Sequence, residues 1–151
     1  MNAEAIKKAL AVAHLVGAAG IAVFWAGFYT GLTFPRESLE KKIPYFEAYM
    51  AFEKSFTVPD LTTATVMTIG AVGILSAPAT RRGETLLIAA SGGLVFLGML
   101  DVGYDLRNGM YSLGESFSIG LLSVPLVGLL GLTTILFFLL RDRTPPASPP
   151  C

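Results

Sequence analysis

Apolar residues dominate four stretches of the chain, and most polar residues lie in the segments between them. The stretches cover residues 9–33, 61–79, 85–105 and 118–140. A helix of about 20 apolar residues crosses the roughly 30 Å hydrocarbon core of a bilayer, and each stretch is close to or above that length. The pattern therefore predicts an all-α integral membrane protein with four transmembrane helices packed in a bundle.

The composition supports a membrane class. Hydrophobic residues make up 53% of the chain and charged residues 15%, whereas about 25% of residues are charged in a typical soluble domain. Four spans and their loops use residues 1–143, which we expect to form a single transmembrane domain. The Pro-rich residues 144–151 cannot continue a helix and are predicted to be disordered.

The first apolar stretch follows a basic start at residues 7–8, as the apolar part of a signal peptide would. It is longer than a signal peptide requires, and it reaches Trp25 and Tyr29 where a cleavage site needs small residues. We interpret it as a retained helix. Its GxxxG pair at residues 27–31 is typical of close helix packing.

The longest connection, residues 36–57, has helical periodicity. Leu39, Ile43 and Phe46 recur at helical spacing, and charged residues fall on another face. We predict an amphipathic segment, divided by Pro44, that lies in the membrane interface or folds over the mouth of the bundle. The alternative is a flexible, solvated loop.

Basic residues next to the spans predict the orientation. Those on one side stand in short segments at span ends: Lys7, Lys8, Arg81, Arg82, Arg141 and Arg143. By the positive-inside rule, we place both termini and the turn at residues 80–84 in the cytoplasm, and we expect a bacterial plasma membrane. Most acidic residues then face outward: Glu37, Glu40, Glu47, Glu53, Asp60, Asp101, Asp105 and Glu115.

Asp101 is the leading candidate for a functional residue. At about 1.5 Å per residue from Thr85, it lies about 6 Å short of the outer edge of the hydrocarbon core. An unpaired charge there costs several kcal/mol, so the carboxyl faces the bundle interior, pairs, or stays protonated. Asp105 follows one turn later on the same face. The alternative is a structural ion pair of Asp101 with Lys54, Arg36 or Arg107.

Asp60 follows Pro59 just before a span, which is typical of a helix N-cap. If the second and third spans are antiparallel neighbours, Asp60 also reaches the height of Asp105. The hypothesis is a carboxylate group of Asp60, Asp101 and Asp105, roofed by Glu47 or Glu53. Tyrosines at the same membrane face edge this predicted pocket: Tyr29, Tyr104 and Tyr111.

Other site chemistries find little support in the residues. His14, the only histidine, lies near the inner side and so cannot share a metal with Asp101; hydrogen-bonded packing is its expected role. Cys151 is the only cysteine, which excludes an internal disulfide and a thiolate zinc site. A net charge of zero without a basic run argues against nucleic acid. Catalytic residues, metal ligands and cofactors stay unassigned.

The favoured hypothesis is a binding module whose outer-leaflet pocket takes a cation or an amphipathic, lipid-like ligand. One alternative is a membrane enzyme that uses an intramembrane carboxylic acid as general acid or base on a lipid-soluble substrate. Another is an accessory subunit, or a homo-oligomer, that docks through its glycine-rich faces. No motif of a known four-span family matches residue by residue.

Overall fold

The computed structural model describes residues 2–32, 37, 40–43, 45–77, 81–112 and 115–141. Side chains are described for all of these residues except 115–121. Its long helices are α1 (Ala3–Thr30), α3 (Phe46–Ser76), α4 (Arg81–Arg107) and α5 (Glu115–Arg141), and a short 3-10 helix, η1 (Met110–Ser112), joins the last two. Each long helix contains a stretch long and apolar enough to cross a membrane. The predicted bundle of four transmembrane helices is confirmed.

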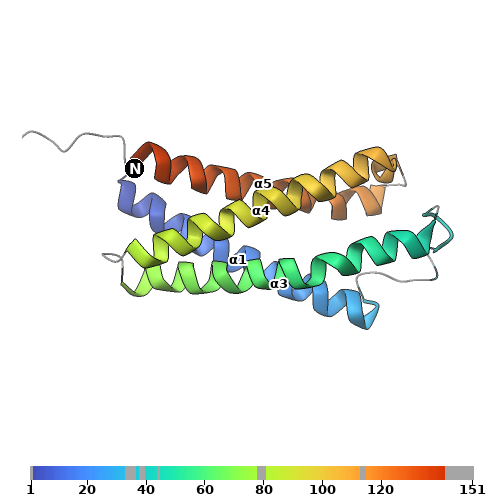
Figure 1. The fold of residues 1–151 in the computed structure, drawn as a ribbon, viewed down its shortest axis with the longest axis horizontal. Coiled ribbons are helices and arrows are strands. Elements are labelled where there is room, and N and C mark those ends of the chain that lie inside the picture. Colours follow the sequence, from blue (N-terminus) through green and yellow to red (C-terminus); the bar gives the residue numbers. More distant parts are fainter. Residues whose placement is uncertain are drawn as a thin grey trace, which may run out of the picture.

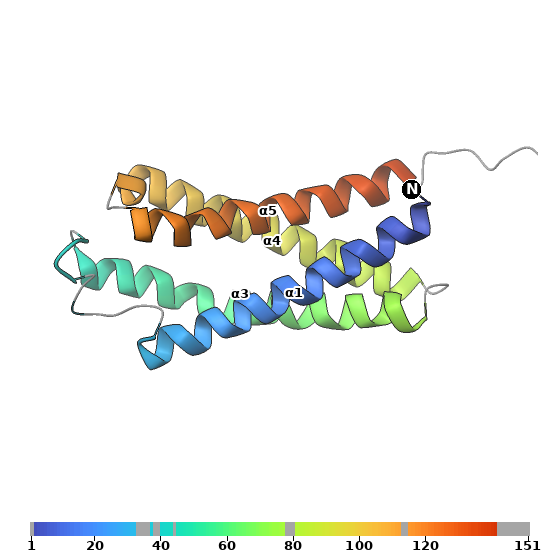
Figure 2. The same ribbon diagram turned by 180° about the vertical axis from the view of Figure 1, so that it is seen from behind.

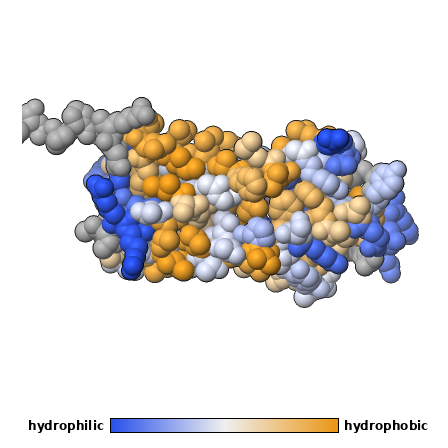
Figure 3. Space-filling model, in the orientation of Figure 1, coloured by the Kyte–Doolittle hydropathy of each residue, from blue (hydrophilic) through white to orange (hydrophobic). Residues whose placement is uncertain are grey.

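The four helices run the length of the molecule in alternating directions (Figure 1). One end, called here the terminal end, holds the start of α1, the α3–α4 turn and the end of α5. The opposite end, the loop end, holds η1 and the connection between α1 and α3. Apolar surface forms a band between the polar ends (Figure 3), and side chains such as Val23 and Phe96 are more than half exposed there. This band is the surface that lipid would cover.

The second helix begins earlier than the apolar pattern indicates. The predicted span starts at residue 61, whereas α3 starts at Phe46, so the second half of the amphipathic segment extends the helix. Asp60 is therefore an interior helical residue, and its predicted N-cap role is wrong. Pro44 lies outside the described residues. Pro59 stands inside α3, and α3 is bent along its length (Figure 1), as expected of a helix that contains a proline, which cannot donate its backbone hydrogen bond.

Packing explains why α3 continues through this amphipathic sequence. Ile43, Phe46 and Tyr49 are buried together with Met110 of η1. One turn on, the Phe52 ring stacks on the ring of Tyr104, with 3.8 Å between the ring centroids. The apolar face of the segment thus lies against α4 and η1. This packing stabilises the continuation of α3 into the segment over a position in the membrane interface.

Small residues let the helices approach closely at two crossings. A Cβ on Gly83 of α4 would lie 2.8 Å from the backbone nitrogen of Ile74 in α3. A Cβ on Gly131 of α5 would lie 2.6 Å from the carbonyl oxygen of Ser91 in α4. The predicted GxxxG packing at residues 27–31 is not seen at Gly31, which has no neighbour within 4 Å of a Cβ. Gly31 instead ends α1 with a φ of 78°.

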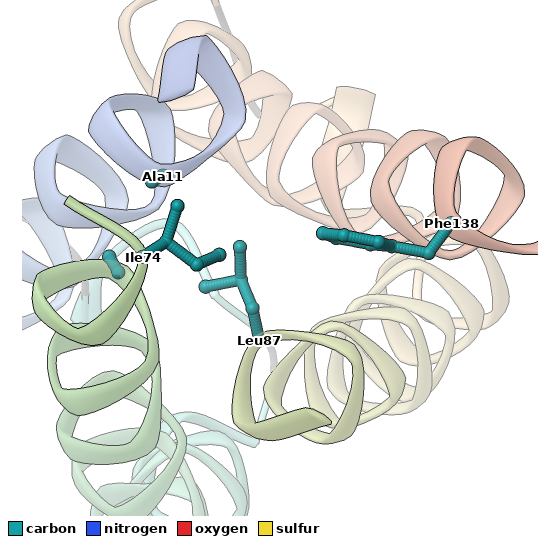
Figure 4. Close-up of a cluster of buried hydrophobic side chains, with 5 residues drawn as sticks. Ala11, Ile74, Leu87 and Phe138 are labelled. Carbon is teal, nitrogen blue, oxygen red and sulfur yellow. The ribbon is translucent and has the colours of Figure 1, made fainter. Parts of the chain in front are cut away.

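An ion-pair cluster joins three helices at the terminal end. Arg141 of α5 donates from Nη1 and Nη2 to the two carboxylate oxygens of Glu84 in α4, at 3.0 and 2.8 Å. Lys7 of α1, which is 5% exposed, donates to the same carboxylate at 3.3 Å and pairs with Glu4 at 2.8 Å. Buried apolar side chains pack nearby, Ala11, Ile74, Leu87 and Phe138 among them (Figure 4).

His14 has the packing role expected from the sequence. Its ring is fully buried, Nδ1 donates to the carbonyl oxygen of Leu10 at 2.9 Å, and Nε2 lies 3.0 Å from the hydroxyl of Ser91. The Ser91 hydroxyl also lies within hydrogen-bonding distance of the Leu87 carbonyl, at 2.7 Å. Both ring nitrogens therefore have partners, and the histidine ties α1 to α4.

The close crossing of α3 and α4 predicts an asymmetry between two glycines of α4. Gly83→Ala places a methyl group against α3 backbone, so it should lower the free energy of unfolding by about 1–3 kcal/mol. Gly92→Ala is the matched control, because its Cβ meets nothing within 4 Å. Thermal unfolding in detergent measures both variants. Equal melting temperatures would contradict the crossing.

The ion-pair cluster predicts a stability role for Glu84. Glu84→Gln removes the charge that pairs with Arg141 and Lys7, so buried Lys7 loses one of the carboxylates that pair with it. We expect a loss of about 1.5–3 kcal/mol, the usual range for hydrogen bonds to charged groups. Glu40→Gln, at an exposed position near the loop end, is the control and should leave the denaturation midpoint unchanged.

Candidate functional site

A half-enclosed cavity of about 280 Å³ lies between the four helices. Its apolar wall is formed by Ile21, Phe24, Phe56, Leu94, Leu97, Val124 and Val127. Small or hydroxyl-bearing residues complete the lining: Gly17, Gly20, Gly98 and Ser123. Three carboxylates also line it, those of Glu53, Asp60 and Asp101. The cavity thus combines a mostly apolar surface with several acidic groups.

Two helices supply the three carboxylates. Glu53 and Asp60 stand two turns apart on α3, which places them on one face of that helix. Asp101 comes from α4, which packs beside α3. The carboxylate of Glu53 is buried, and those of Asp60 and Asp101 are partly exposed to the cavity. The extension of α3 to Phe46 is what brings Glu53 into the bundle.

Neutral groups donate hydrogen bonds to two of these carboxylates. The indole Nε1–H of Trp25 donates to Oδ2 of Asp60 at 3.0 Å. The hydroxyl of Tyr49 is hydrogen-bonded to Glu53, one turn away on α3. Neither bond neutralises a charge, so each carboxylate still lacks a counter-ion if it is ionised.

Cationic side chains do not pair with the aspartates within the described part of the chain. Lys54 and Arg107, the sequence candidates for such a pair, are exposed, and neither forms an ion pair with Asp101 or Asp105. Arg36, the third candidate, lies outside the described residues. The structural ion-pair alternative therefore finds no support in Lys54 or Arg107.

Asp105 lies one turn beyond Asp101 on α4 and outside the cavity lining. Its side chain is almost fully buried, with 1% of the residue exposed. Oδ2 of this carboxyl has no hydrogen-bond partner among the residues that the structure describes. An unsatisfied polar atom at such a depth costs free energy, more so when the group is charged.

The tyrosines of the predicted pocket do not line the cavity. Tyr29 is 61% exposed, and its hydroxyl lies 2.9 Å from that of Thr57. Tyr104 packs on Phe52. Tyr111 belongs to η1 and does not line the cavity. Burial, with smaller contributions from the charges of Asp105 and Asp101, raises the pKa of its hydroxyl. Glu47, a proposed roof residue, is exposed on α3 and also stands outside the lining.

Residues that sequence reasoning did not assign to the site include Trp25, Phe24 and Phe56. Trp25 is 3% exposed, and it packs with Phe28 and Phe56. A buried indole N–H normally has a hydrogen-bond acceptor, so the sequence could have indicated that Trp25 lies beside a polar or acidic side chain. The position of the two phenylalanines depends on helix rotation, which the apolar pattern leaves open.

The composition of the lining decides which chemical groups could contact it. Among the residues described, no three side chains of metal-binding type converge on a position that could hold a metal ion. The mostly apolar wall suits a ligand with a hydrocarbon body, and the carboxylates suit a positive group on it. The fold and this cavity define a small multi-pass membrane protein. No family model matches the chain, and neither a curated protein nor a solved structure is found to be similar.

The lack of counter-ions among the described residues predicts how the protein responds when an aspartate is made neutral. Asp101→Asn and Asp105→Asn remove a charge that pairs with no described cationic side chain, so each should leave the melting temperature unchanged or raise it. Thermal unfolding in detergent, with Glu84→Gln as the destabilised comparison, measures this. A clear fall for either variant would mean that its carboxylate makes a stabilising ion pair.

Proposed function

We propose that this protein binds a small organic cation with an apolar body, such as a lipid-like amine, in the cavity between its helices. The observation that carries the proposal is the lining itself: three carboxylates in a mostly apolar cavity, without a cationic side chain beside them in the described structure. A bound cation supplies the missing charge. Without a ligand, the unpaired carboxylates carry an electrostatic cost. Because the bound cation removes this cost, its removal contributes to the binding free energy.

The size and walls of the cavity support this ligand class. About 280 Å³ is just below the range of roughly 300–1,000 Å³ that is usual for ligand pockets, so the ligand is small or only partly enclosed. Phe24 and Phe56 offer aromatic faces to an ammonium group. A hydrocarbon body then packs against the leucine and valine side chains of α4 and α5.

The proposed orientation places the terminal end in the cytoplasm of a bacterial plasma membrane. Lys8, Arg81 and Arg82 are exposed at that end, next to the spans. Short, basic segments of this kind favour the cytoplasmic side. Glu53 and Asp101 lie toward the loop end of their helices, so the cavity would belong to the outer half of the membrane.

Trp25 offers a direct readout of binding. It is the only tryptophan in the chain, and it donates to a carboxylate that lines the cavity. We expect decylamine, which is cationic at neutral pH, to change the Trp25 emission saturably when it is added to the protein in liposomes. Decanol, of the same chain length and without charge, should bind at least about tenfold more weakly, because it cannot form a charge-assisted hydrogen bond.

Variants separate this site from unspecific partition into the membrane. Asp101→Asn and Glu53→Gln should each weaken decylamine binding by roughly tenfold or more. Glu40→Gln removes an exposed carboxylate that does not line the cavity and should bind as the unchanged protein does. Equal responses to decylamine and decanol, or an Asp101→Asn response like that of Glu40→Gln, would overturn the proposal.

A further inference from the structure

We infer that ligands reach the cavity from the lipid phase, through a seam between α1 and α5 whose edges are Gly20 and Ser123. This inference rests on the proposed function and narrows its ligand class. It selects amphiphiles that dissolve in the bilayer, with a hydrocarbon chain that stays in the membrane while the cationic group reaches the acidic residues. Water-soluble amines of similar charge are then poor ligands.

The arrangement of the helices leaves this seam open. α1 packs along α3, α3 along α4 and α4 along α5, whereas α1 and α5 touch only sparsely. Figure 2 shows that α1 and α5 come together at the terminal end and diverge toward the loop end. The cluster of Lys7, Glu84 and Arg141 links both helices at the end where they converge. Farther along, residues of both helices line the cavity.

The cavity meets the protein surface at this seam. α1 and α5 both contribute to its lining, and among their lining residues Gly20 of α1 and Ser123 of α5 are exposed. A Cβ on Gly20 would meet no atom within 4 Å. Two small residues therefore border an opening where larger side chains would stand in the way.

The surface around the seam is apolar. Val23 of α1 and Leu126 of α5 are 68% and 65% exposed, as lipid-facing side chains are. Toward the loop end, Trp25 and Phe28 pack with Phe56, which lines the cavity. A route through the seam therefore leads to an apolar surface, next to the hydrocarbon in which an alkylamine concentrates by partition.

Binding kinetics test the seam. Stopped-flow measurement of Trp25 emission follows decylamine association with the full-length protein in liposomes. Gly20→Leu adds a larger side chain at a position whose Cβ would meet no neighbour within 4 Å, and Ser123→Leu adds one at the opposite edge. Gly92→Leu is the matched control, because Gly92 is an exposed glycine without neighbours that does not line the cavity. We expect association to slow by roughly tenfold in the first two variants and to stay unchanged in the control.

The alkyl chain length of the amine provides an independent test of lipid entry. Butylamine carries the same ammonium group and partitions far less into a bilayer, so its association rate at equal aqueous concentration should be much lower than that of decylamine.

Equal rates for the two amines, or unchanged association in Gly20→Leu and Ser123→Leu, would overturn lipid entry and leave the binding site intact. A change of oligomeric state in Gly20→Leu, measured by light scattering, would show an interface between copies instead. If the unchanged protein shows no decylamine response that Asp101→Asn weakens, the proposed function fails as well.

Discussion

Several carboxylates that have no cationic partner among the described residues, held in a bundle whose outer surface is apolar, impose the main constraint on this protein. Glu53, Asp60 and Asp101 share one cavity, and buried Asp105 lies one helical turn beyond. Ionised carboxylates in such surroundings repel one another and lack the solvation that water would provide. In the described part of the chain, neutral donors from Trp25 and Tyr49 bond to these carboxylates, and no arginine or lysine pairs with them. Such an arrangement costs stability, and this cost is the basis of the proposed binding function.

The two ends of the bundle differ in how closely their helices pack. At the terminal end, glycines bring α3 and α4 into backbone contact, and the paired charges of Lys7, Glu84 and Arg141 link α1, α4 and α5. Toward the loop end, α1 and α5 diverge, and aromatic side chains fill much of the space beside the cavity. Close helix packing and ion pairs thus characterise the terminal end, whereas α1 and α5 lie farther apart toward the loop end. The proposed entry of ligand from the lipid phase depends on this difference.

The sequence predicted the spans because a bilayer demands long apolar helices, and it predicted a group of Asp60, Asp101 and Asp105, because antiparallel spans fix their heights. Asp60 and Asp101 line the cavity together with Glu53, one of the two predicted roof residues, whereas Asp105 and Glu47 do not line it. It did not predict that α3 begins at Phe46, because residues 46–57 read equally well as an interfacial helix; contacts with Met110 and Tyr104 decide the matter. Gly31 likewise resembled a packing residue and serves as a helix terminus. The bond from Trp25 to Asp60 depends on the rotation of two helices about their axes, which a pattern of apolar residues does not determine.

The central proposal is that the acidic cavity between the four helices holds the charged end of an amphiphile. Photolabelling tests it most directly, with a decylamine that carries a diazirine near its amine, followed by peptide mapping of the protein labelled in liposomes. The account predicts labels concentrated on Ile21, Phe24, Val124 and Val127, and their loss when unlabelled decylamine competes. Labels spread over exposed residues such as Phe96 and Leu126, unaffected by the competitor, would contradict it.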